Sequence, residues 1–585
     1  MLKIFKNNKI KDWIFILIIG ILVYAQVWLD LKLPDYMSSI TKLVQTEGSK
    51  LEDILYNGGM MMLCAFGSLI GAIITGYFTS KFSSNLSMNI RKRLFDKIED
   101  LSLAEINKYQ TSSLITRTTN DITQIQMFAA MGLQMLIKAP LTAILAIIKI
   151  TNKSWQWSML TAVSVVILLS IIITLIIIVV PKFKLMQKLT DRLNSVAREK
   201  ITGIRVVRAF NAEKFHDDKF NKVNEDLTNT QLFNQKTFSI MQPVMYLLMN
   251  GLALGIFIVG ANLIDSADMV DKIPLFGDMV VFSSYALQII SSFLMLALIF
   301  MILPRAQVSA NRINEVLDSK SSIIYGKNKK ENDIKGEVEF KNVFFKFPDA
   351  DEYLLRDISF KVNKGEVFAI IGSTGSGKSS LIDLIPRLYD CNKGEVLVDR
   401  INVKEYDEEY LNNKIGFVSQ KAIIFNGSVN YNVMFGKANS KIDKEKVKEA
   451  IEVAQAKEFV EKMDNGYDSI ISSGGTNISG GQKQRISIAR AIARNPEIFI
   501  FDDSFSALDY KTDSMLRKKL KEYTNGATTI IVAQRIGTIM NADKILVLDE
   551  GKIVGLGNHN ELLKTCDVYK QIALSQLSKE ELENE

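Results

Sequence analysis

A glycine-rich run that ends in a lysine and two serines is the part of the sequence best equipped for chemistry. The run is Gly372, Ser373, Thr374, Gly375, Ser376, Gly377, Lys378, Ser379 and Ser380. A buried-strand pattern at 366–371 precedes it and a helical pattern at 380–389 follows it, which is the context that a phosphate-binding P-loop requires. In such a loop, backbone N–H groups cradle phosphates, Lys378 adds charge for the β and γ phosphates, and the Ser379 hydroxyl can bind Mg²⁺. A merely flexible turn is the alternative, and the flanking strand and helix argue against it.

A second apolar stretch ends in a carboxylate. Residues 498–502 read Ile-Phe-Ile-Phe-Asp, and P-loop folds place an aspartate for Mg²⁺ at the end of such a strand. Asp502 is therefore the predicted aspartate on the magnesium side. The pattern is weak alone, but it follows a P-loop in the same chain, so the expected ligands are ATP and Mg²⁺.

Six long apolar stretches fill the first half of the chain, at 13–29, 58–78, 128–150, 155–180, 241–264 and 279–303. Each approaches or exceeds the ~20 residues that a helix needs to cross the hydrocarbon core of a bilayer. Basic residues precede the first stretch and follow the second and fourth, at Lys3, Lys6, Lys9, Lys11, Arg91, Lys92, Arg93, Lys182, Lys188 and Arg192. Because basic residues favour the cytoplasmic side, these ends and the N-terminus are predicted to face the cytoplasm.

Two long polar connections, 79–127 and 181–240, lie between these stretches. Apolar and charged residues alternate within them as in packed helices, so extended helices are predicted in preference to disordered loops. A polar linker at 321–335 separates the first part, 1–320, from the second, 336–585, where short β-rich runs alternate with helical runs. The predicted fold is a six-span α-helical transmembrane domain followed by an α/β nucleotide-binding domain.

The composition of the 585 residues agrees with a membrane protein, since 48% are hydrophobic and the mean hydropathy is positive. The net charge of +7 is also compatible with nucleic-acid binding, but lysine-rich cytoplasmic loops give the same surplus, and no nucleic-acid partner is expected. Cys64, Cys391 and Cys566 lie far apart, which favours neither a disulfide framework nor a zinc site.

Further motifs connect the P-loop with a known family. Ser479, Gly480, Gly481 and Gln482 open a helical run, and residues 506–509 read SALD. With the P-loop and Gln420 in the run IGFVSQ, their order and spacing resemble the ABC transporter ATPases. The six spans and long cytoplasmic helices resemble the exporters of that family, which carry a fused membrane domain.

The resemblance implies specific roles for these residues. In the family, two ATPase domains enclose two ATPs, each held by the P-loop of one chain and the signature motif of the other. The residues expected to contact the partner chain's ATP are Ser479, Gly480, Gly481, Gln482 and Asp509. Gln420 is expected to join Ser379 and Asp502 as a magnesium ligand, although one loop glutamine could simply be solvated.

Two residues depart from the family's catalytic pattern. Where hydrolysing members place a glutamate as base, this chain has Asp503, which is one methylene shorter. Misplacing a catalytic group by ~1 Å costs on the order of a hundredfold in rate. The family's switch histidine is here Gln534, which can hydrogen-bond a γ-phosphate but cannot titrate near neutral pH. The two histidines of the chain, His216 and His559, lie elsewhere in the sequence, so neither can replace the switch residue.

Single positions add detail. Phe347 stands where the family usually has a tyrosine that stacks on adenine, and its ring can either stack in the same way or pack in the core. Lys138 is a charged residue near the middle of the third stretch, which predicts either a functional role or a packing role in which it snorkels or pairs inside the bundle. Polar residues of other spans could line a cavity or join helices; they are Gln134, Gln242, Asn250 and Gln288.

Together these inferences predict one half of an exporter in a bacterial plasma membrane. The pattern resembles the degenerate-site subunit of heterodimeric multidrug exporters, so the expected partners are a second, non-identical half-transporter, membrane lipids and an amphipathic drug or lipid as substrate. The alternative is a homodimeric, nucleotide-gated regulatory or channel-like protein with weak ATPase activity. An importer is disfavoured because importers of this superfamily usually carry the membrane and ATPase parts on separate chains.

Overall fold

A computed structural model describes residues 3, 10–46, 48–151, 153–329, 333–436, 443–524 and 526–577. Lys6 and Lys9, two of the basic residues that precede the first predicted span, lie outside this set, as do residues 330–332 of the linker. The chain divides into a helical unit, Met1–Ile98 with Ser112–Asp318, and an α/β unit, Glu99–Thr111 with Ser319–Glu585. The segment Glu99–Thr111, which contains helix α4 (Leu103–Tyr109), therefore groups with the second half of the chain.

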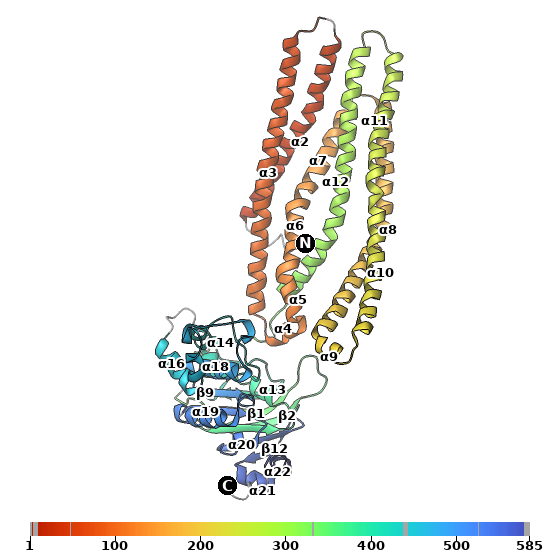
Figure 1. Ribbon diagram of the computed structural model, residues 1–585. Helices are drawn as coiled ribbons and strands as arrows, with labels where there is room; N and C mark the ends of the chain where they lie inside the picture. The colour runs from red at the N-terminus through yellow and green to blue at the C-terminus, as the bar shows by residue number, and fades with distance from the viewer. Residues whose placement is uncertain are drawn as a thin grey trace. The chain divides into compact units, whose positions relative to one another are not determined.

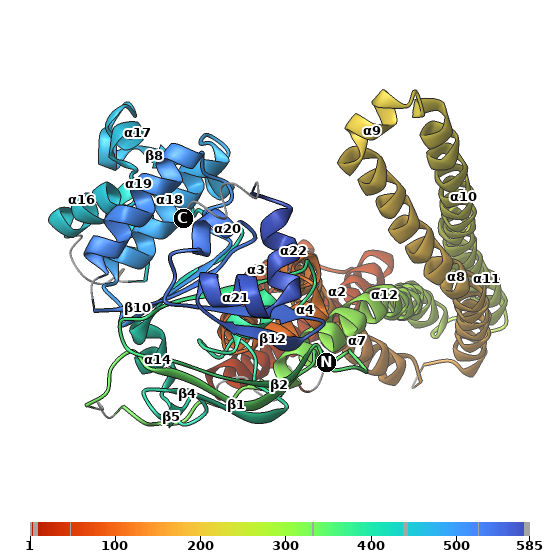
Figure 2. The same cartoon turned by 90° about the horizontal axis from the view of Figure 1, so that it is seen from below.

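The helical unit contains the six predicted spans (Figure 1). Its helices are α2 (Ile10–Gln45), α3 (Leu51–Glu99), α5 (Thr111–Thr116), α6 (Ile122–Met127), α7 (Leu133–Thr151), α8 (Trp155–Thr202), α9 (Ile204–Ala209), α10 (Glu213–Ser239), α11 (Met241–Asp265) and α12 (Lys272–Asp318). At 1.5 Å per residue, the 49 residues of α3 extend roughly 70 Å, more than twice the hydrocarbon thickness of a bilayer. The polar connections are thus helical, as predicted. Figure 2 shows α9 at the tip of the hairpin that α8 and α10 form.

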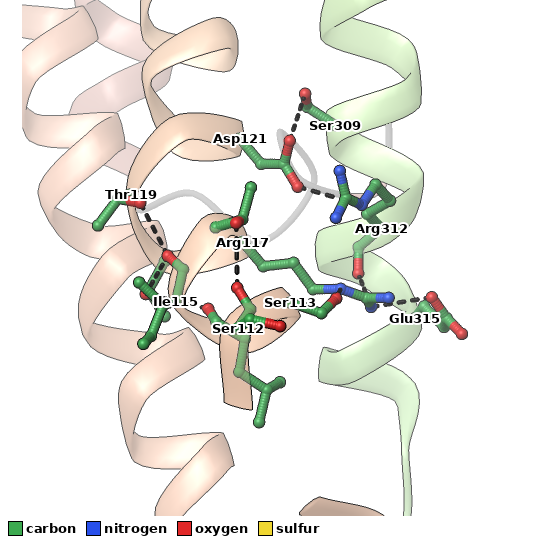
Figure 3. Close-up of polar contacts among 12 residues, drawn as sticks. Ser112, Ser113, Ile115, Arg117, Thr119, Asp121, Ser309, Arg312 and Glu315 are labelled. Atoms are coloured by element: carbon green, nitrogen blue, oxygen red, sulfur yellow. Dashed lines mark hydrogen bonds and ion pairs between the residues drawn. The ribbon is translucent and has the colours of Figure 1, made fainter. Parts of the chain in front are cut away.

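Two π-helical turns, η1 (Arg117–Asp121) and η2 (Phe128–Gly132), lie between α5 and α7. Charged side chains join η1 to α12 (Figure 3). Arg117 Nη1 donates to the Arg312 carbonyl at 2.7 Å and lies 2.8 Å from Glu315 Oε2. Asp121 accepts from Ser309 Oγ at 3.0 Å and lies 3.4 Å from Arg312 Nε. Arg117 and Asp121 are both buried, and residues of α12 compensate their charges. These contacts hold η1 against α12.

The α/β unit is built on a six-stranded sheet in the order β12-β11-β3-β10-β9-β6. These strands are β3 (Val367–Gly372), β6 (Ile415–Val418), β9 (Ile498–Asp502), β10 (Thr528–Val532), β11 (Lys544–Asp549) and β12 (Lys552–Gly557). The pairs within β11-β3-β10-β9-β6 are parallel, and β12 is antiparallel to β11. Successive side chains of β9 alternate between two apolar cores: Phe499 and Phe501 enter one, Ile498 and Ile500 the other. Burial on both faces explains why this strand reads as a continuous apolar run.

A four-stranded antiparallel sheet, β2-β1-β4-β5, adjoins the second of these cores. Its strands are β1 (Val338–Phe345), β2 (Leu355–Val362), β4 (Lys393–Val398) and β5 (Ile401–Asn402), and β7 (Gly427–Ser428) pairs with β8 (Ile470–Ile471). The helices of the unit are α13 (Lys378–Asp383), α14 (Glu408–Lys414), α15 (Val429–Val433), α16 (Lys444–Val453), α17 (Lys457–Glu461), η3 (Gly466–Asp468), η4 (Ser473–Gly475), α18 (Gly480–Ala493), α19 (Tyr510–Tyr523), α20 (Ile536–Ile539), α21 (His559–Thr565) and α22 (Asp567–Leu574). The predicted fold class is confirmed for both parts of the chain.

Candidate nucleotide-binding site

The site forms where neighbouring parallel strands end. In the strand register, Val532 of β10 stands beside both Ile370 of β3 and Asp502 of β9. The loops that follow these three strands therefore emerge at the same edge of the sheet. They carry the P-loop, Asp503 and Gln534, so the sheet brings together residues that are more than 150 positions apart in the sequence.

The P-loop glycines have steric reasons to be glycine. Gly375 and Gly377 have φ angles of 86° and 99°, which L side chains rarely adopt. A Cβ on Gly372 would lie 1.9 Å from the carbonyl oxygen of Leu548 on β11. The loop can therefore pass close to β11 and turn into α13 only with glycine at these positions.

Lys378 at the start of α13 is positioned by its own loop. Its ammonium donates to the carbonyl oxygens of Gly372 at 2.9 Å and Ser373 at 2.7 Å. Burial lowers the pKa of Lys378, and the nearby carboxylates of Asp503 and Asp502 oppose that shift. Ser376 Oγ is buried and has no hydrogen-bond partner among the described residues. A desolvated cation beside a hydroxyl without a partner fits the phosphates that the sequence predicts here.

Oxygen ligands for Mg²⁺ stand next to the loop. Ser379 Oγ donates to Asp502 Oδ1 at 3.1 Å, so a hydroxyl and a carboxylate converge from α13 and β9. Burial raises the pKa of Asp502, while the Ser379 bond lowers it. Asp383, one and a half turns along α13, has its pKa raised to about 6 by burial and by Asp502. Hard oxygen ligands of this kind suit Mg²⁺, which would supply charge neutralisation for the phosphates when bound.

Asp503, at the predicted catalytic-base position, is hydrogen-bonded by neighbouring side chains. Gln534 Nε2 donates to Asp503 Oδ2 at 3.0 Å, and the Gln420 side chain also hydrogen-bonds to Asp503. Burial raises the pKa of Asp503, opposed by hydrogen bonds with Ser506 and Gln420. The structure thus brings Asp503, Gln534 and Gln420 together, and two amide groups compete for the carboxylate that would accept a proton.

Phe347 lies at the surface and not in the core. Its side chain is 37% exposed, and its ring meets Tyr389 edge-on at 5.4 Å and Phe345 at 5.1 Å. Tyr389 also accepts a hydrogen bond from Asn107 of α4 at 3.1 Å. The partly open ring leaves room for the predicted stacking on adenine.

The predicted partner-site residues lie at two helix starts, where Ser479, Gly480 and Asp509 are exposed and Gly481 and Gln482 are partly exposed. Ser479 caps α18, and its hydroxyl and the Gln482 side chain form a reciprocal capping box. Asp509 caps α19 by accepting from the Thr512 amide at 2.9 Å, and this bond lowers the pKa of Asp509. Among the described residues, no hydrogen bond or ion pair links Ser479 or Asp509 to the P-loop. Ser479 and Gly480 are exposed, as a contact with another chain's nucleotide would require.

Two side-chain contacts in the structure were not predicted from the sequence. Gln576, just after α22, donates to the Gln534 carbonyl at 2.7 Å and accepts from the Ile536 amide at 2.8 Å, so it holds the loop that carries the switch position. Lys138 lies 3.5 Å from Asp30, so it has an ion-pair partner within the bundle. No local pattern marks Gln576, whereas Asp30 could have been found by extending the first span by one residue.

The geometry defines a membrane protein with a P-loop ATPase domain, and comparisons with known proteins give its family. Residues 16–293 match the ABC transporter transmembrane region and residues 355–506 match the ABC transporter ATPase. An uncharacterised ABC transporter ATP-binding protein of Mycobacterium tuberculosis is 38% identical over 522 residues, which cover 88% of this chain and 87% of that protein. The chain belongs to the ABC transporter family.

Two further comparisons are with a named transporter and with a solved structure. The ATP-dependent lipid A-core flippase of Aromatoleum aromaticum is 31% identical over 496 residues, covering 84% of this chain and 80% of the flippase. A bacterial Atm1-family ABC exporter with ATP bound has the same fold, with a TM-score of 0.82 at 21% identity over 97% of this chain and 98% of that one. The chain is thus a half-transporter of exporter fold, with a membrane domain and an ATPase domain fused in one polypeptide.

Proposed function

We propose that the chain is the ATP-binding half of a heterodimeric exporter that moves amphipathic drugs or lipids out of the cytoplasm or the inner leaflet. Its own pocket, formed by Lys378, Asp502, Asp503 and Gln534, binds Mg²⁺ and ATP and hydrolyses ATP slowly. Ser479 and the residues around it complete a second pocket with the P-loop of the partner chain, and most turnover occurs there.

This proposal rests on the Asp503 carboxylate, which is already hydrogen-bonded within the pocket. It is one methylene shorter than glutamate, and its Oδ2 already accepts the Gln534 amide at 3.0 Å. Gln534 cannot take up a proton, so no switch imidazole assists the attack of water. The phosphate-binding part of the same pocket keeps its glycines, its lysine and its pair of oxygen ligands.

This combination separates binding from cleavage. Phosphates are held by backbone N–H groups and Lys378, whereas cleavage needs a base placed against the attacking water. A pocket with the first set and a weakened second set holds ATP for long periods and stabilises the closed pair of ATPase domains. The name of the Aromatoleum relative supports a lipid-like substrate.

The proposal is tested by co-purifying this chain with the half-transporter encoded beside it, if that neighbour has glutamate and histidine at the positions of Asp503 and Gln534. We expect the reconstituted pair to hydrolyse ATP at least tenfold faster than this chain alone. Replacing the partner's glutamate by glutamine should abolish turnover and export. Equal activity of this chain alone would contradict the proposal and favour the homodimeric alternative.

A further inference from the structure

Charged and polar side chains meet between helices α2, α3 and α7 of the membrane-spanning part. Asp30 on α2 lies 3.5 Å from the ammonium of Lys138 on α7, and it accepts a hydrogen bond from the Ser68 hydroxyl on α3. About a third of the Asp30 side chain and a quarter of the Lys138 side chain are exposed. Ionisable groups within apolar helices are costly and generally mark substrate or ion pathways.

Two buried amide oxygens, on α2 and α12, lack partners among the described residues. Gln26 precedes Asp30 by one helical turn on α2 and is 7% exposed, and its Oε1 has no hydrogen-bond partner among the described residues. The same is true of the buried Oε1 of Gln288 on α12. A buried acceptor without a partner costs stability, which is a reason to look for a ligand that supplies the missing donor.

The register between α2 and α12 places Gln288 at the same height as Asp30. Tyr285 on α12 donates to the Leu31 carbonyl of α2 at 2.9 Å, and Lys42 near the end of α2 lies 3.4 Å from Asp278. The two helices therefore run antiparallel, so higher residue numbers on α2 lie opposite lower residue numbers on α12. The two contacts place Gln288, one turn beyond Tyr285 on α12, at the level of residues 28 to 32 of α2, a stretch that includes Asp30.

We propose that Gln26, Asp30, Ser68, Lys138 and Gln288 form a binding site for an amphipath whose headgroup carries a protonated amine next to an anionic group, as phosphatidylethanolamine does. The carboxylate and the two amide oxygens receive the N–H donors of the amine, and Lys138 receives the anionic group. This inference rests on the proposed export of amphipathic compounds and names their headgroup chemistry.

Charge compensation selects this class of headgroup. A ligand with only a cation would displace Lys138 from Asp30 and leave the Lys138 ammonium unpaired in the membrane, and a ligand with only an anion would do the same to Asp30. A zwitterion compensates both groups at once. A choline headgroup is also zwitterionic, but its quaternary nitrogen has no N–H to donate to Gln26 or Gln288, so it should bind less well than ethanolamine.

The test uses the full chain, reconstituted in vesicles that contain equal amounts of phosphatidylethanolamine, phosphatidylcholine and phosphatidylglycerol. The protein is extracted in mild detergent, and its retained lipids are quantified by mass spectrometry. We expect phosphatidylethanolamine to be enriched at least threefold over each of the other two lipids. The enrichment should be lost in Asp30→Asn and in Lys138→Gln.

Two further variants separate a ligand site from a role in folding. Gln26→Leu removes the acceptor without a partner and leaves the ion pair intact, so it should abolish most of the enrichment while the protein stays at least as resistant to heat. Asp278→Asn, on α12, breaks ion pairs elsewhere in the same unit, with Lys42 of α2 at 3.4 Å and with Lys153 in the turn after α7 at 2.8 Å, and should retain the enrichment.

Equal retention of the three lipids by the unmodified chain would overturn the proposal, and so would undiminished enrichment in Asp30→Asn or Gln26→Leu. The proposed function fails by a different result. If the reconstituted pair moves no amphipath while the Asp30-dependent enrichment persists, the site stands and the export proposal falls.

Discussion

Restoring the family's base and switch residues should convert the pocket of this chain into a hydrolysing one. The double variant Asp503→Glu, Gln534→His extends the carboxylate by one C–C bond, about 1.5 Å, and removes the amide that donates to it at 3.0 Å. A base misplaced by ~1 Å costs on the order of a hundredfold, and general-base catalysis contributes roughly 10²–10⁴. We therefore expect at least a hundredfold gain in turnover, which corresponds to about 2.7 kcal/mol of barrier.

The assay uses the co-purified pair with the partner's own catalytic glutamate changed to glutamine, so that only the pocket of this chain can turn over. Single-turnover hydrolysis of radiolabelled ATP is measured with and without the double variant. Adding Lys378→Ala should remove the regained activity, because Lys378 belongs to this pocket alone. The reasoning is refuted if the unmodified pocket already turns over as fast as the double variant, or if Lys378→Ala leaves the gain intact.

Other predictions test single contacts of the same unit. Phe347→Ala should weaken ATP binding by about fivefold or more, because base stacking on an aromatic ring contributes roughly 1–3 kcal/mol, but it should not weaken binding of tripolyphosphate, which has no base; equal losses for both ligands would contradict the stacking role. Asp383→Asn should increase the free energy of unfolding of the α/β unit at pH 7.5. The pKa of Asp383 is raised to about 6 in the folded state from 3.8, so the protonated Asp383 side chain makes its full contribution to stability below pH 3.8. That contribution is lost as the pH rises through 6. A rise in pKa of that size corresponds to at most about 3 kcal/mol of stability. Hydrogen exchange of α13 should therefore be slower in the variant than in the unmodified protein at pH 7.5, and nearly equal in the two proteins at pH 4. Gln576→Ala should speed hydrogen exchange at 533–537, since it removes two hydrogen bonds to that loop, whereas Gln571→Ala, an exposed glutamine on α22, should leave the exchange unchanged.

The sequence alone indicates the P-loop because the requirements of that loop are local. Gly372 and Gly377 are required by steric contacts of a loop only a few residues long, and the apolar strand before the loop is readable from its own residues. Convergence of Asp503 and Gln534 follows once β3, β10 and β9 are recognised as parallel neighbours. The bond between the two side chains does not follow, because it depends on rotamers that the packing selects.

Long-range contacts account for what the sequence did not reveal. The apolar pattern of the first span stops at Leu29, yet α2 continues to Gln45, so the partner of Lys138 lay one residue outside the predicted span. Gln576 lies 42 residues from Gln534, and an isolated glutamine after a helix has no pattern that indicates its target. The π-turn η1 also has no signal in hydrophobic periodicity, and its cause is tertiary, since Arg117 and Asp121 turn toward α12.

Phosphate binding and hydrolysis have separate physical origins in a pocket of this kind, so the proposed asymmetry needs changes at only two positions. Phosphate affinity depends on backbone N–H groups that the positive φ angles of Gly375 and Gly377 direct, together with the charge of Lys378. Hydrolysis depends on the reach of one carboxylate and on one imidazole. Changing Glu to Asp and His to Gln therefore leaves every phosphate-binding group in place. Because the P-loop and the exposed start of α18 stay intact, a chain that acts as proposed would keep both surfaces that a paired ATPase domain needs while its own hydrolysis is slow.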